Sequence, residues 1–332
     1  MQRFATFARA WAVAAAALCG SATGLISEAS AQSDFPTKRV TFVVPFTPGG
    51  AGDLIARAMA TRLSAIWGQP VVVENRPGAG GNTGSRSVAQ AAPDGHTILI
   101  GSTSSHAINS SLYGARMPYD VQRDFAAIVM VANSPHILMI NPSVPARNLA
   151  ELIAYARANP GKLNFSSGGN GTSTHLAGEL LNSMAGLRIQ HIPYRGAPEA
   201  VAGVVAGDTQ MMFENLSGAL AQIRVGRLKG IAITSSAPSP KAPDLPTVAQ
   251  QLPGFETGVW FGIFGPAATP APLVRRLNQD LAALIASAEL REQFDRLGMD
   301  PIGGSPAEAT AFIASELAKW GKVVASSGAT ID

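Results

Sequence analysis

The stretch VTFVVPFTPGGAGD, residues 40–53, joins an apolar run to a glycine-rich loop that leads into a helix-like segment. The near-continuous apolar run from Val40 to Phe46 predicts a buried strand. Apolar residues at helical spacing between Leu54 and Trp67 predict an amphipathic helix. A strand that enters a helix through such a loop is typical of parallel sheets flanked by helices. The stretch therefore predicts an α/β fold.

The same order of elements continues along the chain and then recurs. After the first helix we expect a strand, a short helix and a strand at 70–74, 85–92 and 97–100. A second block predicts strands at 163–166, 189–194 and 210–213, and helices at 175–184 and 198–205. Both blocks run strand, glycine-rich loop, helix, strand, helix, turn, strand. We therefore expect two similar α/β lobes.

The segments outside the two blocks predict how the chain passes between the lobes. Two consecutive strands, 128–131 and 137–140, lead from the first lobe to the second. Strands at 230–234 and 259–264 follow, and then helices at 271–286, 289–297 and 306–324. We expect a discontinuous first lobe, 33–133 plus 258–332, a second lobe, 134–257, and a cleft between them.

Residues 1–31 have the features of an export signal. Arg3 and Arg9 supply positive charge, residues 10–18 are apolar, and Ala29 to Ala31 are small, as at a cleavage site. The apolar run is shorter than the roughly 20 residues that span a bilayer. Processing as a lipoprotein at Cys19, the only cysteine, is an alternative that bulky Leu18 disfavours. Cleavage near Ala31 predicts a mature protein without cysteine, beyond the inner membrane.

The composition excludes several classes of protein. The 332 residues carry a net charge of +3 and only 14% are charged, against about 25% in ordinary soluble domains. The basic residues form no cluster, so we expect no nucleic-acid partner. The sequence contains neither a P-loop nor a nucleophile elbow, and its five histidines lack metal-ligand spacing. We therefore predict no cofactor, no metal and no catalytic residue.

Ligands of open α/β sheets bind beyond the carboxyl ends of the strands, at helix N-termini that favour anions. This rule selects the loops 45–53, 101–106, 166–174 and 213–217, which are rich in glycine, hydroxyl and amide groups. Such neutral donors suit a carboxylate. The candidate ligand-binding residues are Phe46, Thr47, Gly49, Gly50, Gly52, Asp53, Ser104, Ser105, His106, Asn170, Gly171, Thr172, Ser173, Tyr194, Arg195 and Asn215.

Some of these residues have a second interpretation. Asp53 is either an N-cap or a partner for a ligand ammonium group, and Arg195 is either a cleft cation or a solvated charge at a strand end. Trp260 and Phe261 suit the core better than a ligand platform. The loop 76–82 lacks the third glycine of a dinucleotide fingerprint, so it is weak evidence for a cofactor site.

Eight motifs follow one another along the chain: VVPFTPGG (43–50) with Asp53, VVENRPGAGG (72–81), APDG (92–95), NPGKL (159–163), GNGT (169–172), HIPY (191–194), LPTV (245–248) and KW (319–320). In this order they resemble the Bug-type solute-binding proteins of tripartite tricarboxylate transporters. The resemblance covers the whole mature chain. It implies a type II periplasmic binding protein, or Venus flytrap: a monomer with two lobes, each a mixed sheet flanked by helices.

The resemblance also implies a function. Such a protein closes on a small carboxylate and delivers it to the transporter's membrane subunits, with residues 46–53 and 170–173 gripping the ligand. The family often has Lys at the position of Arg195 and Asp at that of Glu214, which leaves the contacts to the ligand's far end open. We expect a non-enzymatic periplasmic receptor for a mono- or dicarboxylate, aliphatic or aromatic. The alternatives are a periplasmic sensor and, less favoured, a secreted hydrolase or isomerase that uses Asp53 or Glu214.

Overall fold

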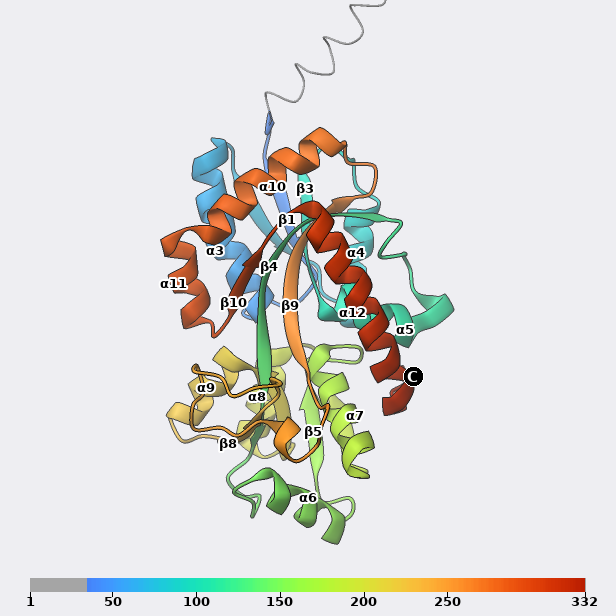
Figure 1. Cartoon of the computed structure of the whole chain (residues 1–332), viewed down its shortest axis with the longest axis vertical. Coiled ribbons are helices and arrows are strands. Elements are labelled where there is room, and N and C mark those ends of the chain that lie inside the picture. Colours follow the sequence, from blue (N-terminus) through green and yellow to red (C-terminus); the bar gives the residue numbers. More distant parts are fainter. Residues whose placement is uncertain (1–34, 332) are drawn as a thin grey trace, which may run out of the picture.

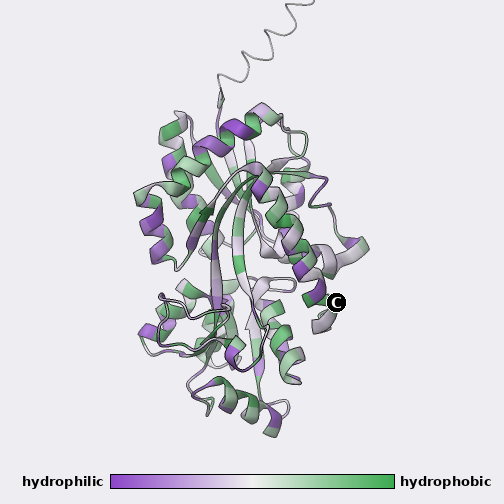
Figure 2. Ribbon diagram, viewed as in Figure 1, coloured by the Kyte–Doolittle hydropathy of each residue, from purple (hydrophilic) through white to green (hydrophobic). Residues whose placement is uncertain are grey.

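The computed structural model describes residues 35–331, which form two α/β lobes arranged along the long axis of the molecule (Figure 1). The predicted export signal, residues 1–31, lies outside the described residues. None of the helices within 35–331 is long and apolar enough to cross a membrane. Hydrophobic residues line the strands and the inner faces of many helices, and hydrophilic residues gather on peripheral helices and loops (Figure 2).

The sheet of the first lobe has the strand order β2 (Val71–Asn75), β1 (Val40–Val44), β3 (Thr97–Ser102), β9 (Gly258–Pro266), β4 (Phe125–Ile140) and β10 (Asp300–Gly303). Strands β1, β2 and β3 are parallel, whereas β9, β4 and β10 join as antiparallel neighbours. Apolar side chains of helices α3 (Ala51–Trp67), α10 (Ala271–Ala286) and α11 (Ala288–Arg296) share one core cluster, and α12 (Pro306–Ser327) contributes to another. Helix α4 (Asn82–Ala89) also packs on this sheet.

The second lobe repeats this arrangement. Its strand order is β6 (Gln190–Pro193), β5 (Asn164–Ser167), β7 (Met211–Asn215), β4 and β8 (Lys229–Ile233), and β5 pairs in parallel with both neighbours as β1 does. Helices α6 (Leu149–Ala158), α7 (Ser173–Ala185), α8 (Ala197–Ala206) and α9 (Leu216–Arg224) belong to this lobe. The predicted repeat of two α/β blocks is therefore confirmed.

One prediction about the passage between the lobes is wrong. The expected strands 128–131 and 137–140 are parts of a single 16-residue strand, β4, which runs through both sheets (Figure 1). The polar residues between the two apolar runs stay extended because they pair with β9: Asn133 lies opposite Trp260, and Pro135 opposite Gly258. The two lobes are thus joined by two paired antiparallel strands.

The remaining elements lie in the connections. They are the short helices η1 (Ala79–Gly81), η2 (Ser104–Ile108), α5 (Asn109–Tyr113), η3 (Gly114–Arg116) and η4 (Val248–Gln250). Helix α12 packs beside α7 of the second lobe, where the Ser183 hydroxyl donates to the Ser326 carbonyl at 2.7 Å. One oxygen of Glu316 accepts the indole N–H groups of Trp260 and Trp320 at 2.7 and 2.9 Å, which fixes α12 against β9.

Candidate ligand-binding site

A cavity of about 580 Å³ lies between the lobes, where the carboxyl ends of both sets of parallel strands meet. Both lobes and the crossing strand β9 form its wall. The lining comprises residues 45–47, 50–52, 77–81, 102, 104, 113, 168–170, 172–174, 193–197, 215, 259 and 261. The cavity thus occupies the place that strand order alone indicates for a ligand.

The structure brings most of the predicted site residues to this wall. Phe46, Thr47, Gly50, Gly52, Ser104, Asn170, Thr172, Ser173, Tyr194, Arg195 and Asn215 line the cavity. The others lie outside the lining and take part in contacts behind it: Gly49, Asp53, Ser105, His106 and Gly171. Contact of any of these residues with a ligand stays a prediction.

Asp53 organises the first glycine-rich loop. Its buried carboxylate accepts hydrogen bonds from Gly49 N at 3.0 Å, Arg57 Nε at 2.9 Å and Asn75 Nδ2 at 2.9 Å. Burial opposes ionisation, but the hydrogen bonds from Arg57, Gly49 and Asn75 outweigh it and hold the pKa of Asp53 below its usual value. Both oxygens already have protein donors, so this geometry favours a role in shaping the loop.

Two helices present uncapped N-termini to the cavity. Helix α3 starts after Gly50 and α8 after Gly196, and neither glycine can supply a side-chain cap. Ala51, Gly52 and Ala197, in the first turns, line the cavity. The first N–H groups of a helix lack partners within it, and the helix dipole adds partial positive charge there. An anion in the cavity would satisfy donors from both lobes.

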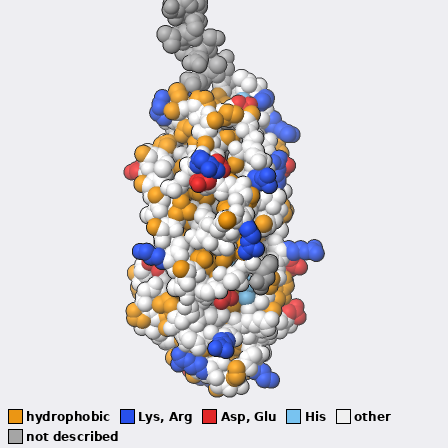
Figure 3. All heavy atoms as spheres, turned by 90° about the vertical axis from the view of Figure 1, so that its right-hand side faces the viewer, with side chains coloured by type: hydrophobic (Ala, Val, Ile, Leu, Met, Phe, Trp, Pro, Cys, Tyr) orange, Lys and Arg blue, Asp and Glu red, His pale blue; other side chains and the backbone are white. Residues whose placement is uncertain are grey.

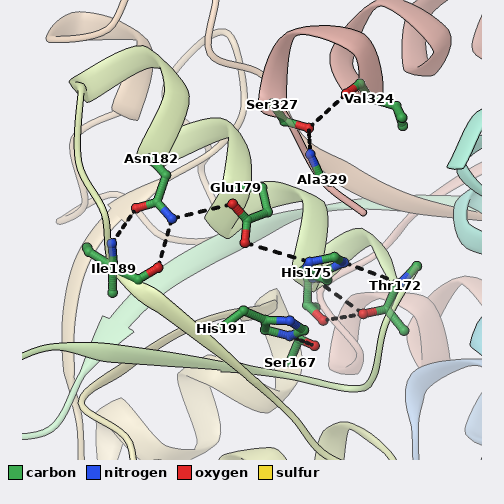
Figure 4. A network of polar contacts seen from close by, with 12 residues as sticks. Ser167, Thr172, His175, Glu179, Asn182, Ile189, His191, Val324, Ser327 and Ala329 are labelled. Atoms are coloured by element: carbon green, nitrogen blue, oxygen red, sulfur yellow. Dashed lines mark hydrogen bonds and ion pairs between the residues drawn. The ribbon is translucent and has the colours of Figure 1, made fainter. Parts of the chain in front are cut away.

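The loop before α7 differs from the first glycine-rich loop, because a histidine ring and not a carboxylate accepts the hydrogen bond from its backbone. Gly169 and Gly171 have φ angles of +120° and +77°, which glycine adopts without strain. Gly171 N donates to His175 Nδ1 at 3.3 Å. The ring of His175 stacks on that of His191, with 4.0 Å between the ring centroids (Figure 4). Burial lowers the pKa of His175 to about 4, so the ring stays neutral and can accept this bond.

His106 and His191 also lie inside the fold and support neighbouring residues. Burial lowers the pKa of His106 to about 3, and its ring stacks on Phe264 with 4.1 Å between centroids. Ser167 Oγ lies 2.6 Å from His191 Nε2. Within residues 35–331, no group of three His, Cys, Asp or Glu side chains is placed to hold a metal ion.

The cavity wall combines neutral donors with apolar surface and one cation. Arg195 is the only charged residue among the lining residues that the structure describes, and its side chain is exposed. Phe46, Val259 and Phe261 supply apolar surface. Phe261 is only 3% exposed and belongs to the core, yet it also lines the cavity, so it is both a core residue and part of the surface offered to a ligand. The wall suits a carboxylate on a hydrocarbon body.

Sequence reasoning missed part of the wall. The loop 77–81 lines the cavity, although only a dinucleotide site was considered there. It follows β2 at the same edge as the loops after β1 and β3, so the rule that selected those loops also applies to it. Tyr113 and Gly196 were missed as well. Tyr113 comes from the short helix α5, which the pattern of apolar residues did not predict.

Glu214, the other acid considered for catalysis, lies beside the cavity lining in the core. It is 5% exposed, lies outside the lining and has one oxygen, Oε2, without a partner among the described residues. Burial raises the pKa of Glu214 to about 7, although a backbone hydrogen bond from Asn215 opposes this. Neither Asp53 nor Glu214 therefore presents a carboxyl group to the cavity.

The raised pKa of Glu214 predicts a pH-dependent stability. Between pH 4.5 and 7 the folded state holds a proton on Glu214 that the unfolded state releases, so the contribution of Glu214 to the free energy of unfolding falls as pH rises. The fall is about 3 kcal/mol across this window. Four buried histidines with lowered pKa values have the opposite effect below about pH 6.5, so the prediction concerns the difference between Glu214→Gln and wild type. The free energy of unfolding of Glu214→Gln should increase relative to that of wild type from pH 5 to 8, as measured by urea unfolding, and should exceed it at pH 8. An unchanged pH dependence would contradict the assignment.

The charges on one face of the outer surface are dispersed. On the face that carries α5, α7 and α12, Lys and Arg side chains lie singly among acidic and uncharged groups (Figure 3). Lys319 of α12 is paired with Glu256 and with Glu316, each at 3.7 Å.

Comparison with known proteins agrees with this architecture. The family model described as "Tripartite tricarboxylate transporter family receptor" (TctC) matches residues 55–329. Protein BugT of Bordetella pertussis is 36% identical over 310 residues, 93% of this chain and 94% of its own. The structure of Rhodopseudomonas palustris Rpa4515 with adipate has a TM-score of 0.86 at 35% identity, covering 90% of this chain and 100% of the other.

A further solved structure shows the same fold. MatC (Rpa3494) of Rhodopseudomonas palustris, with bound malate, has a TM-score of 0.82 at 31% identity and covers 87% of this chain and 100% of its own. The predicted two-lobed fold and the resemblance to Bug proteins are confirmed. The chain belongs to the tripartite tricarboxylate transporter receptor (TctC) family.

Proposed function

We propose that this protein is a periplasmic receptor that binds a small mono- or dicarboxylate between its lobes and delivers it to membrane subunits of a tripartite tricarboxylate transporter. The observation that carries the proposal is the pair of uncapped helix N-termini, at Gly50 and Gly196, that face one cavity from opposite lobes. Family membership supports it, as do the adipate and malate bound by two relatives, because both ligands are dicarboxylates.

One ligand carboxylate would lie at the N-terminus of α3, within reach of the Thr47 hydroxyl and the N–H groups of residues 50–52. Asn170, Thr172 and Ser173 offer donors from the second lobe. In a dicarboxylate the far carboxylate would reach Arg195. Each hydrogen bond to the charged ligand contributes about 1.5 to 3 kcal/mol, and a helix terminus about 0.3 to 2 kcal/mol. After the costs of association, about −8 kcal/mol remains, which corresponds to micromolar affinity.

Binding closes the lobes because the ligand contacts both of them and so stabilises the closed state differentially. The moving bodies are residues 33–133 plus 258–332 and residues 134–257, and the paired strands β4 and β9 form the hinge. The receptor acts as a monomer. It is not an enzyme, so the bound compound is released unchanged; Asp53 and Glu214, the two acids considered for catalysis, lie outside the lining that the structure describes.

Calorimetry on the mature chain, residues 33–332, tests the proposal. Adipate, malate, benzoate and hexanoate are titrated, with hexane-1,6-diol as a neutral control of adipate's length. At least one carboxylate should bind with a Kd near micromolar, and the diol should not bind.

Arg195→Gln should weaken binding of the dicarboxylates about tenfold and leave the monocarboxylates within about twofold. If no carboxylate binds more tightly than millimolar, the proposed function is wrong.

A further inference from the structure

A continuous series of polar contacts runs from the cavity wall to the hinge. The backbone N–H of Ser173, the first residue of α7, donates to Ser104 Oγ of the opposite lobe at 3.1 Å. The hydroxyl of Ser173 lies 3.2 Å from His136 Nε2, and His136 Nδ1 lies 3.3 Å from Thr257 Oγ1. Both serines line the cavity, His136 belongs to β4, and Thr257 immediately precedes β9.

His136 is firmly held at the centre of this series. His136 has no exposed surface. Its backbone N–H donates to Thr234 Oγ1 at 2.8 Å, and its backbone carbonyl accepts from Thr234 N at 2.9 Å. The Thr234 hydroxyl also lies 2.6 Å from the carbonyl oxygen of Thr257. The ring therefore keeps a fixed position relative to both crossing strands at the point where they leave the second lobe.

The chemistry of a neutral imidazole gives the series a direction. One ring nitrogen donates and the other accepts, so one neighbouring hydroxyl must accept from the ring and the other must donate to it. Burial lowers the pKa of His136 to about 3, and its hydrogen-bond partners are all uncharged. The ring consequently stays neutral at the pH of the periplasm.

Ser104 acts as a cap supplied by the other lobe. The N-terminal N–H groups of a helix lack partners within the helix. Thr172 satisfies one such group of α7 within its own loop, the N–H of His175. The N–H of Ser173 is satisfied across the cleft, and this bond exists only while the lobes are together.

We propose that His136 is a positioning residue for closure: it orients Ser173, so that the N-terminus of α7 meets Ser104 only at the lobe angle set by β4 and β9. When the lobes separate, the bond between Ser104 and Ser173 is lost, whereas the contacts of Ser173 with the hinge remain. Loss of one buried hydrogen bond from the closed state shifts the ratio of closed to open molecules about fivefold. The consequence for ligand affinity rests on the proposed function, whereas the closure itself does not.

The test compares variants that keep different halves of the series. His136→Gln places an amide near the position of Nε2 and retains the contact with Ser173, whereas His136→Asn reaches only the position of Nδ1. Spin labels on the exposed positions Thr61 of α3 and Ala202 of α8, each changed to Cys, report the interlobe distance without ligand. Cys19, in the predicted export signal, is absent from the mature chain, residues 33–332, so only the introduced cysteines are labelled.

We expect Ser104→Ala and His136→Asn to lower the closed-to-open ratio about fivefold, and His136→Gln to stay within twofold of wild type. Ser173→Ala, which keeps the backbone bond but loses the contact with His136, should behave like His136→Asn and serves if the His136 variants do not fold. Equal distances in the Asn and Gln variants, or an unchanged distance in Ser104→Ala, would overturn the proposal. Failure of wild type to bind any carboxylate would instead count against the proposed function alone.

Discussion

Replacing Gly196 with valine is expected to abolish carboxylate binding while the protein stays folded. Gly196 precedes α8 in an extended conformation, with φ −177° and ψ 167°, which valine adopts without strain. A Cβ at this position would collide with the Thr47 side chain of the opposite lobe. The closed arrangement is then sterically blocked, and the dissociation constant should rise about a thousandfold, a loss of about 4 kcal/mol.

Calorimetry with the tightest-binding carboxylate and a thermal unfolding scan measure this effect. Ala202→Val is the matched control, because it adds similar bulk at an exposed position of the same helix. The control should bind normally, and both variants should unfold within a few degrees of wild type. Normal affinity in Gly196→Val would show that ligand binding does not require the lobes to approach as closely as they do here.

Asp53→Ala should lower the free energy of unfolding by about 3 kcal/mol, about 1 kcal/mol for each hydrogen bond that the carboxylate accepts. The substitution deletes the acceptor of Gly49 N and Arg57 Nε, which belong to exposed residues, and one of two acceptors of Asn75 Nδ2. Asn75 also donates to the Phe46 carbonyl at 3.1 Å, so the first glycine-rich loop should lose its shape. Carboxylate affinity should fall with stability.

Urea unfolding measures the loss, and Glu289→Ala is the control. Glu289 is an exposed acid in the first turn of α11, so its removal should cost less than about 1 kcal/mol. The lowered pKa of Asp53 means that its contribution is present above the unfolded-state value of 3.8 and disappears as pH falls through the lower folded-state value. The gap between wild type and Asp53→Ala should therefore narrow below about pH 3.8. A gap that does not depend on pH would contradict the charged role.

Local patterns were sufficient to predict most of the fold. Each block consists of short apolar runs and amphipathic segments separated by glycine-rich turns, and the helix 271–286 was predicted with the bounds that the structure has. The single strand β4 was not predicted, because its extended middle depends on pairing with β9, more than 120 residues later. Strand β10 has no apolar alternation of its own and forms only against β4. Helix α6 carries a recognisable cap, Asn148 with Glu151, that was overlooked.

For the candidate site too, the sequence was sufficient to predict one part and not the other. Its location follows from strand order, because the carboxyl ends of parallel strands share an edge. The roles of individual residues depend on partners distant in sequence, and no spacing rule reveals these. Asp53 contacts Asn75, which lies 22 residues away, and His106 stacks on Phe264, more than 150 residues later in the chain. A cap, a core residue and a ligand contact therefore look alike until the chain is folded.

The uncapped starts of α3 and α8 have a consequence for how ligand preference can change. Their donors are main-chain N–H groups, which no substitution other than proline removes. Under the proposed function, lining side chains such as Tyr113, Asn170 and Arg195 can therefore be exchanged to suit a new solute while the main-chain donors for its carboxylate remain. Directed evolution toward a new acid should therefore vary these lining side chains and keep Gly50 and Gly196, where the two helices begin.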